Sequence, residues 1–123
     1  AIMVSSDGSP TMNHPRGYGS FSRIIEEYVL QKGLLELEEA IRKMSSLPAA
    51  TFGITDRGII GAGMKADILV FDPEAIRTRA AFDKPHQLSE GMDLVLVNGA
   101  QALTKGTFSE TGSGIMLRKK NGL

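Results

Sequence analysis

The chain has 123 residues, with 14 basic and 14 acidic side chains and no cysteine. The balanced charge offers no basic surface for nucleic acid, the lack of cysteine excludes disulfides and thiolate metal ligands, and no apolar run approaches the roughly 20 residues that span a bilayer. We therefore expect no nucleic-acid partner, no membrane partner and a cytoplasmic location.

The first residues predict a buried strand. Residues 1–4 are apolar without alternation, which is typical of a parallel strand buried on both faces, and a polar turn sequence follows them. Catalytic groups gather at the carboxyl ends of parallel strands, so Asp7 is the first candidate for chemistry. The alternative is that residues 6–10 form only a turn, because each of them favours turns.

Residues 9–20 are rich in proline and glycine and predict a loop. The loop carries two candidate site residues, His14 and Arg16. Apolar side chains then recur at spacings of three and four, which predicts a helix that begins at Ser20 or Ser22 and ends at Gly33.

A second helix is expected at residues 37–44, where acidic residues at the start and basic residues near the end oppose the helix dipole. Their spacing predicts two ion pairs four residues apart. Ser46 is expected to cap a short third helix, which Gly53 ends.

The periodicity changes to that of strands in the second half of the chain. Strands are expected at 66–72, 92–97 and 100–104, with a short final strand at 114–119 and a helical turn within 73–82. Asn98-Gly99 is a strong hairpin signal between the second and third of these strands.

Five stretches of the chain carry a family resemblance: 5–10 (SSDGSP), 14–19 (HPRGYG), 33–48, 58–72 (GIIGAGMKADILVFD) and 85–99 (PHQLSEGMDLVLVNG). Together they resemble the carboxyl-terminal part of N-acyl-D-amino-acid deacylases, which are metal-dependent members of the amidohydrolase superfamily. ADILVFD and LVNG occur widely in amidohydrolases, whereas HPRGYG and PHQLSEG point to the deacylase branch.

The resemblance implies an α/β fragment. Residues 1–55 correspond to the last strand, site loop and helices of a (β/α)8 barrel, and residues 56–123 to the carboxyl-terminal half of a small flanking β-sandwich. Without the rest of either unit, apolar faces should be exposed. The expected partner is the missing amino-terminal portion of the same enzyme or another copy of the chain.

The resemblance also implies roles for the candidate residues. Asp7 corresponds to the aspartate beside the metal that moves a proton from the attacking water to the leaving amine, so it is also a candidate metal ligand. Arg16 corresponds to the arginine that holds the α-carboxylate of the substrate, a role that suits its planar fork; the alternative is a surface arginine.

Two histidines complete the candidates. His14 can ligate metal, orient Asp7 or hydrogen-bond within its loop, and the loop role is favoured because the family's metal ligands come mainly from earlier strands. His86 lies in a segment that we expect to be structural rather than catalytic.

We therefore expect part of a hydrolase that cleaves the amide bond of N-acyl-D-amino acids to a D-amino acid and a carboxylate, with zinc in the intact enzyme. The chain alone should be inactive and bind no metal, because it has no cysteine and no His-x-His pair. The alternatives are a non-catalytic structural or subunit-interface module, and another amidohydrolase such as a dihydroorotase or hydantoinase.

Overall fold

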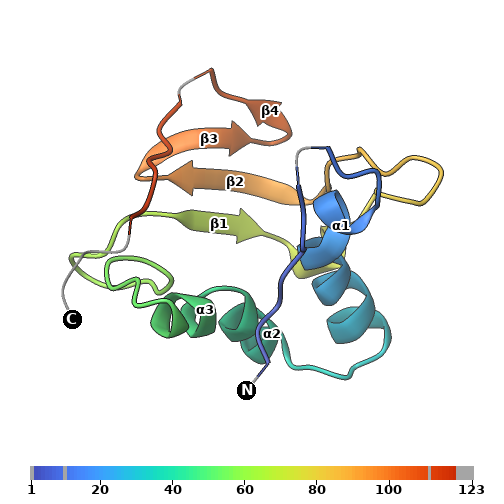
Figure 1. The fold of residues 1–123 in the computed structure, drawn as a ribbon, viewed down its shortest axis with the longest axis horizontal. Coiled ribbons are helices and arrows are strands. Elements are labelled where there is room, and N and C mark those ends of the chain that lie inside the picture. The colour runs from blue at the N-terminus through green and yellow to red at the C-terminus, as the bar shows by residue number, and fades with distance from the viewer. Residues whose placement is uncertain (1, 10, 111, 119–123) are drawn as a thin grey trace.

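The computed structural model describes residues 2–9, 11–110 and 112–118, and it places a group of helices beside an antiparallel sheet (Figure 1). The helical elements are α1 (Arg16–Arg23), η1 (Ile24–Gln31), α2 (Leu37–Met44), α3 (Ser46–Thr51) and the short 3-10 helix η2 (Pro73–Ala75). The sheet has four strands in the order β1 (Ile68–Phe71), β2 (Met92–Val97), β3 (Ala100–Thr104) and β4 (Thr107–Phe108). The fold is therefore a small α/β unit.

Residues 2–9 form no strand, so the expected buried strand is wrong for the part of it that the structure describes; Ala1 lies outside that part. The backbone of this segment is held by a hydrogen bond from the Val4 amide to the Lys43 carbonyl at 3.1 Å. A parallel strand requires the backbone of a neighbouring strand to complete its ladder, and here the neighbour is the end of α2.

The first helix begins at Arg16, earlier than the predicted start at Ser20 or Ser22. Pro15 precedes it with a φ of −59°, which already suits a helical backbone. The prediction missed this start because the glycines of the HPRGYG stretch indicate a loop, whereas both of them, Gly17 and Gly19, lie inside α1.

From Ile24 the helix widens into the π-helix η1, which the spacing of apolar residues did not predict. The Lys32 amide donates to the Glu27 carbonyl at 2.9 Å, five residues earlier, and the two side chains form an ion pair at 2.6 Å. Gly33 ends the helix with a φ of 59°, as predicted.

The α2 helix is confirmed, but its ion pairs converge on one residue. Glu39 pairs with Arg42 at 2.7 Å and with Lys43 at 3.3 Å, so only the second pair has the predicted spacing of four. Hydrogen bonding from Arg42 lowers the pKa of Glu39 to about 2. Ser46 is the first residue of α3 rather than its cap.

The predicted strands and hairpin at 66–104 are confirmed, with β1 shorter than expected. Asn98 and Gly99 both have positive φ, at 50° and 82°, as a type I′ turn requires. A second turn at Lys105-Gly106 leads into β4, which was not predicted. Residues 114–118 form no strand, and the last residue of that predicted strand lies outside the described residues.

The hydrophobic core is small. Among the residues that the structure describes, the buried apolar side chains are Ile25, Ala40, Ala49, Ile76 and Ala80. As expected, large apolar side chains remain exposed, including Ile60 at 87% and Phe82 at 79%. An apolar groove of about 750 Å³ also opens between the helices η1, α2 and α3 and the strand β1. None of the helices that the structure describes is long and apolar enough to cross a membrane.

Candidate active-site loop

A tight turn presents Asp7 at the surface. The hydroxyl of Ser5 accepts a hydrogen bond from the Asp7 amide at 3.3 Å, and the hydroxyl of Ser6 accepts one from the Gly8 amide at 3.2 Å. Asp7 has a φ of 49°, a left-handed conformation that aspartate tolerates better than most residues. Its side chain is 82% exposed.

The loop brings Asp7 and Arg16 together. A guanidinium nitrogen of Arg16 lies 2.8 Å from Oδ2 of Asp7, and the Arg16 side chain is 46% exposed. Sequence reasoning assigned the two residues to neighbouring steps of one reaction but did not predict their contact. An ion pair this exposed contributes at most about 1 kcal/mol, so a substrate anion can compete for the arginine.

His14 contacts the backbone of Arg16. Its Nδ1 accepts a hydrogen bond from the Arg16 amide at 3.1 Å, which satisfies one of the unpaired amides at the start of α1. Its ring contacts Phe82 edge to face, with centroids 5.0 Å apart. The structure thus gives His14 partners in the loop and in a distant segment, and among the described residues it forms no hydrogen bond or ion pair with Asp7.

A cavity of about 100 Å³ lies next to these residues at the start of α1. Its lining comes from α1, from the loop before it and from residues 78–82: His14, Pro15, Arg16, Gly19, Ser20, Arg23, Thr78, Ala80 and Phe82. Both arginines at its wall have acidic partners, since Arg16 lies 2.8 Å from Asp7 and Arg23 lies 4.0 Å from Glu27.

His86 also reaches the loop, which the sequence did not reveal. Its Nε2 lies 2.8 Å from the carbonyl oxygen of Met12, and its ring centroid lies 5.6 Å from that of Tyr18. The contact joins residues 74 positions apart, and no local pattern signals such a pairing. Only the PHQLSEG stretch of the family resemblance marked this segment as notable.

The described residues do not fit a zinc site by themselves. Within residues 2–9, 11–110 and 112–118, no group of three or more histidine, aspartate or glutamate side chains gathers in a metal-binding arrangement. A catalytic zinc takes three protein ligands, and Asp7 has Arg16 rather than a second carboxylate or imidazole beside it. The described residues alone therefore do not supply the three ligands of a catalytic zinc.

Comparison with protein families shows the family of the chain. The model of the amidohydrolase family matches residues 1–102. The chain belongs to the amidohydrolase family. It is 42% identical over 118 residues to N-acyl-D-glutamate deacylase of Alcaligenes xylosoxydans xylosoxydans, and 39% identical over 119 residues to D-aminoacylase of the same organism. These matches cover 94% and 95% of the chain.

The chain is also similar to solved structures of deacylases. A crystal structure of D-aminoacylase matches with a TM-score of 0.84 and 39% identity over 89% of the chain. N-acyl-D-glutamate deacylase from Bordetella bronchiseptica, solved with zinc and a phosphonate inhibitor, matches with a TM-score of 0.79 and 43% identity over 85% of the chain. The chain spans about a quarter of the length of these relatives: 24% and 25% of the two curated proteins and 23% of each solved chain.

Proposed function

We propose that this chain supplies Asp7 and Arg16 to the active site of an N-acyl-D-amino-acid deacylase. The observation that carries the proposal is the Asp7–Arg16 contact at 2.8 Å, at the head of α1, in a chain 39% to 42% identical to deacylases of this kind over nearly its whole length. A carboxylate can transfer a proton, and a guanidinium beside it can bind the carboxylate of the substrate.

In the proposed reaction, Asp7 moves the proton. Water adds to the acyl carbon, the carbon–nitrogen bond breaks, and the proton lost by the water goes to the leaving nitrogen, which departs as the amine of a D-amino acid. Asp7 takes that proton as a base and returns it as an acid. Its exposure in this chain leaves it accessible to the substrate.

Arg16 holds the α-carboxylate of the substrate. One of its nitrogens faces Asp7, and a guanidinium has several N–H donors in a fixed fork, so the same side chain can contact both Asp7 and a substrate carboxylate. His14 keeps the backbone of Arg16 in place through its Nδ1.

Zinc in such an enzyme has to be held in part by residues outside this chain, because the described residues contain no group of three metal-binding side chains. We propose that residues 1–55 form the end of a catalytic barrel and residues 56–123 half of a flanking sandwich. The rest of the same enzyme, packed in part against the apolar groove, is the proposed partner. The absence of cysteine supports a cytoplasmic location.

A second candidate function is hydrolysis of a cyclic amide. The chain is 34% identical over 55 residues to a dihydroorotase of Lactobacillus gasseri, a match that covers 45% of the chain. The first candidate has the stronger support, since the deacylase matches extend over more of the chain and include the loop with Asp7 and Arg16.

A substrate panel separates the two candidates. The intact polypeptide that carries these residues is purified with zinc and incubated with the N-acetyl derivatives of D-methionine, D-glutamate and D-aspartate, with their L-enantiomers, and with dihydroorotate. Release of D-amino acids supports the deacylase proposal. Hydrolysis of dihydroorotate alone supports the second candidate, and no hydrolysis of either class contradicts both.

A further inference from the structure

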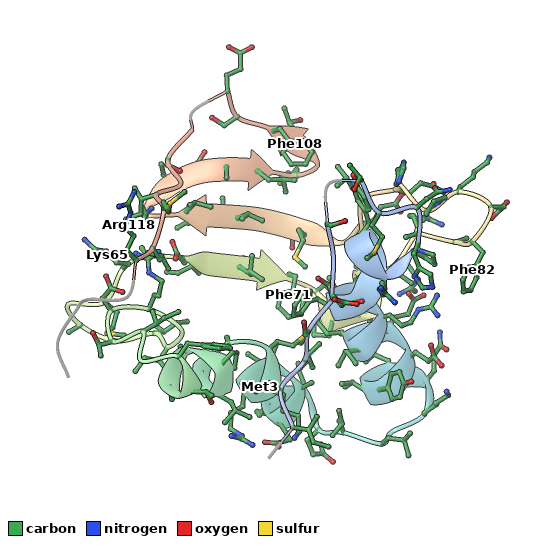
Figure 2. All side chains as sticks on the ribbon, in the orientation of Figure 1. Met3, Lys65, Phe71, Phe82, Phe108 and Arg118 are labelled. Atoms are coloured by element: carbon green, nitrogen blue, oxygen red, sulfur yellow. The ribbon has the colours of Figure 1, made fainter. Side chains whose placement is uncertain are left out.

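Residues 79–90, which we call the strap, lie beside α1 and the loop that precedes it (Figure 1). Figure 2 shows Phe82 on this strap, beyond α1 at the edge of the molecule. Three strap side chains touch the loop or α1: Phe82 packs on His14, His86 contacts Met12, and Ser89 shares a hydrogen bond with Ser22 at 2.6 Å. The strap thus contacts the second half of the candidate active-site loop and α1.

The strap is itself a closed and well-fixed loop. A reciprocal pair of backbone hydrogen bonds at 3.2 and 3.0 Å joins Glu90, its last residue, to Arg77, two residues before its start. Ala81 and Lys84 form a second reciprocal pair at 3.1 Å, and Pro85, next to His86, is buried. Such a frame presents the His86 ring in a defined position.

His86 contacts Met12, which lies between Asp7 and Arg16 in the sequence. Met12 is five residues after Asp7 and four before Arg16, and its carbonyl accepts the hydrogen bond from Nε2 of His86 at 2.8 Å. The Met12 amide donates to the Ser9 carbonyl at 3.1 Å, which closes a turn at the same point. A displacement of Met12 therefore shifts the turn that links Asp7 to Arg16.

We propose that His86 is a positioning residue. Its Nε2–H donates to the Met12 carbonyl, and this bond fixes the 7–16 loop so that the Asp7 carboxylate and the Arg16 guanidinium keep their relative position. The effect of His86 on catalysis rests on the proposed function, because it requires Asp7 and Arg16 to act in the deacylase reaction. The anchoring of the loop by His86 stands on the structure alone.

The test replaces the donor and the ring separately. His86→Gln keeps a side-chain N–H near the position of Nε2 and loses the ring, whereas His86→Phe keeps the ring and loses the donor. Leu88→Ala is the matched control, because Leu88 is on the same strap with 58% exposure and makes no hydrogen bond through its side chain. All variants are made in the intact polypeptide that carries this chain.

We expect activity to depend on whether residue 86 keeps a side-chain N–H donor. His86→Phe lowers kcat/KM by about tenfold or more, because a displacement of about 1 Å near a reacting group can cost about a hundredfold. The kcat/KM values of His86→Gln and Leu88→Ala remain within about threefold of the wild-type value. Hydrogen exchange measured by mass spectrometry is faster in residues 11–16 of His86→Phe only.

Other results overturn the inference. Equal losses in the glutamine and phenylalanine variants that track a lower Tm mean that His86 only packs. Unchanged kinetics and exchange in His86→Phe mean that the bond to Met12 does not hold the loop. If the wild type hydrolyses no N-acyl-D-amino acid, the proposed function fails, and the exchange rates of residues 11–16 alone decide whether His86 anchors the loop.

Discussion

Replacing Asp7 with asparagine separates a catalytic role from a structural one. Asparagine has the same shape and also tolerates the φ of 49° at this position, so the turn is retained. Asp7 is 82% exposed and Arg16 46% exposed, and an ion pair of this kind contributes at most about 1 kcal/mol to the free energy of unfolding. We therefore expect the Tm of Asp7→Asn to stay within a few degrees of wild type.

The effect on turnover should be much larger. Loss of a general acid/base lowers kcat by about a hundredfold or more, which corresponds to about 2.7 kcal/mol of activation free energy. The assay is hydrolysis of N-acetyl-D-methionine by the intact polypeptide, with Tm measured on the same samples. Asp93→Asn, an exposed carboxylate on β2, is the control and should leave kcat unchanged. A near-normal kcat in Asp7→Asn refutes the reasoning, as does a loss that only follows a fall in Tm.

Three further predictions concern Arg16, Gly91 and Glu39. Arg16→Lys should raise KM about tenfold with little change in kcat, because lysine lacks the bidentate fork; an unchanged KM would return Arg16 to the role of a surface residue. Gly91→Ala should destabilise the protein by about 2 to 3 kcal/mol in urea unfolding, since Gly91 has a φ of +96° and a Cβ there would lie 2.4 Å from the Ala75 carbonyl oxygen. Gly63→Ala, with a φ of +82° and no atom within 4 Å, is its control and should be clearly milder. The pKa of Glu39 falls from 4.5 to about 2 on folding, so its contribution to stability is complete above pH 4.5 and is lost as the pH falls through 2. Glu39→Gln should remove this part of the pH dependence of the free energy of unfolding in urea. The same pH dependence in the wild type and in Glu39→Gln would contradict the lowered pKa of Glu39.

The elements that sequence reasoning predicted well are those with strong local signals. The helix α2 has an apolar stripe and charges that oppose its dipole, and the β2–β3 hairpin has Asn98-Gly99, so both lie where the pattern places them. The turn at Lys105-Gly106 has a weaker signal, since lysine rarely adopts the φ of 46° that it has here, and β4 was missed with it.

Other features depend on contacts that no local pattern contains. Residues 2–4 are apolar enough for a strand, yet a strand needs a hydrogen-bonded neighbour, and here Val4 pairs with Lys43 of α2 instead. Asp7 was first suggested by its place after the expected strand, and the family resemblance then implied its role and that of Arg16. The Asp7–Arg16 ion pair and the contact of His86 with Met12 appear only in three dimensions.

The central claim is that Asp7 and Arg16 of this chain belong to a deacylase active site. The most direct test is a crystal structure of the intact polypeptide with zinc and a non-hydrolysable analogue of an N-acyl-D-amino acid. The account predicts the Asp7 carboxylate beside the zinc, either at the ligand distance of about 2.0 to 2.2 Å or one water away, with the Arg16 guanidinium on the carboxylate of the analogue. An analogue and zinc bound elsewhere, with Asp7 and Arg16 still paired in solvent, would contradict it.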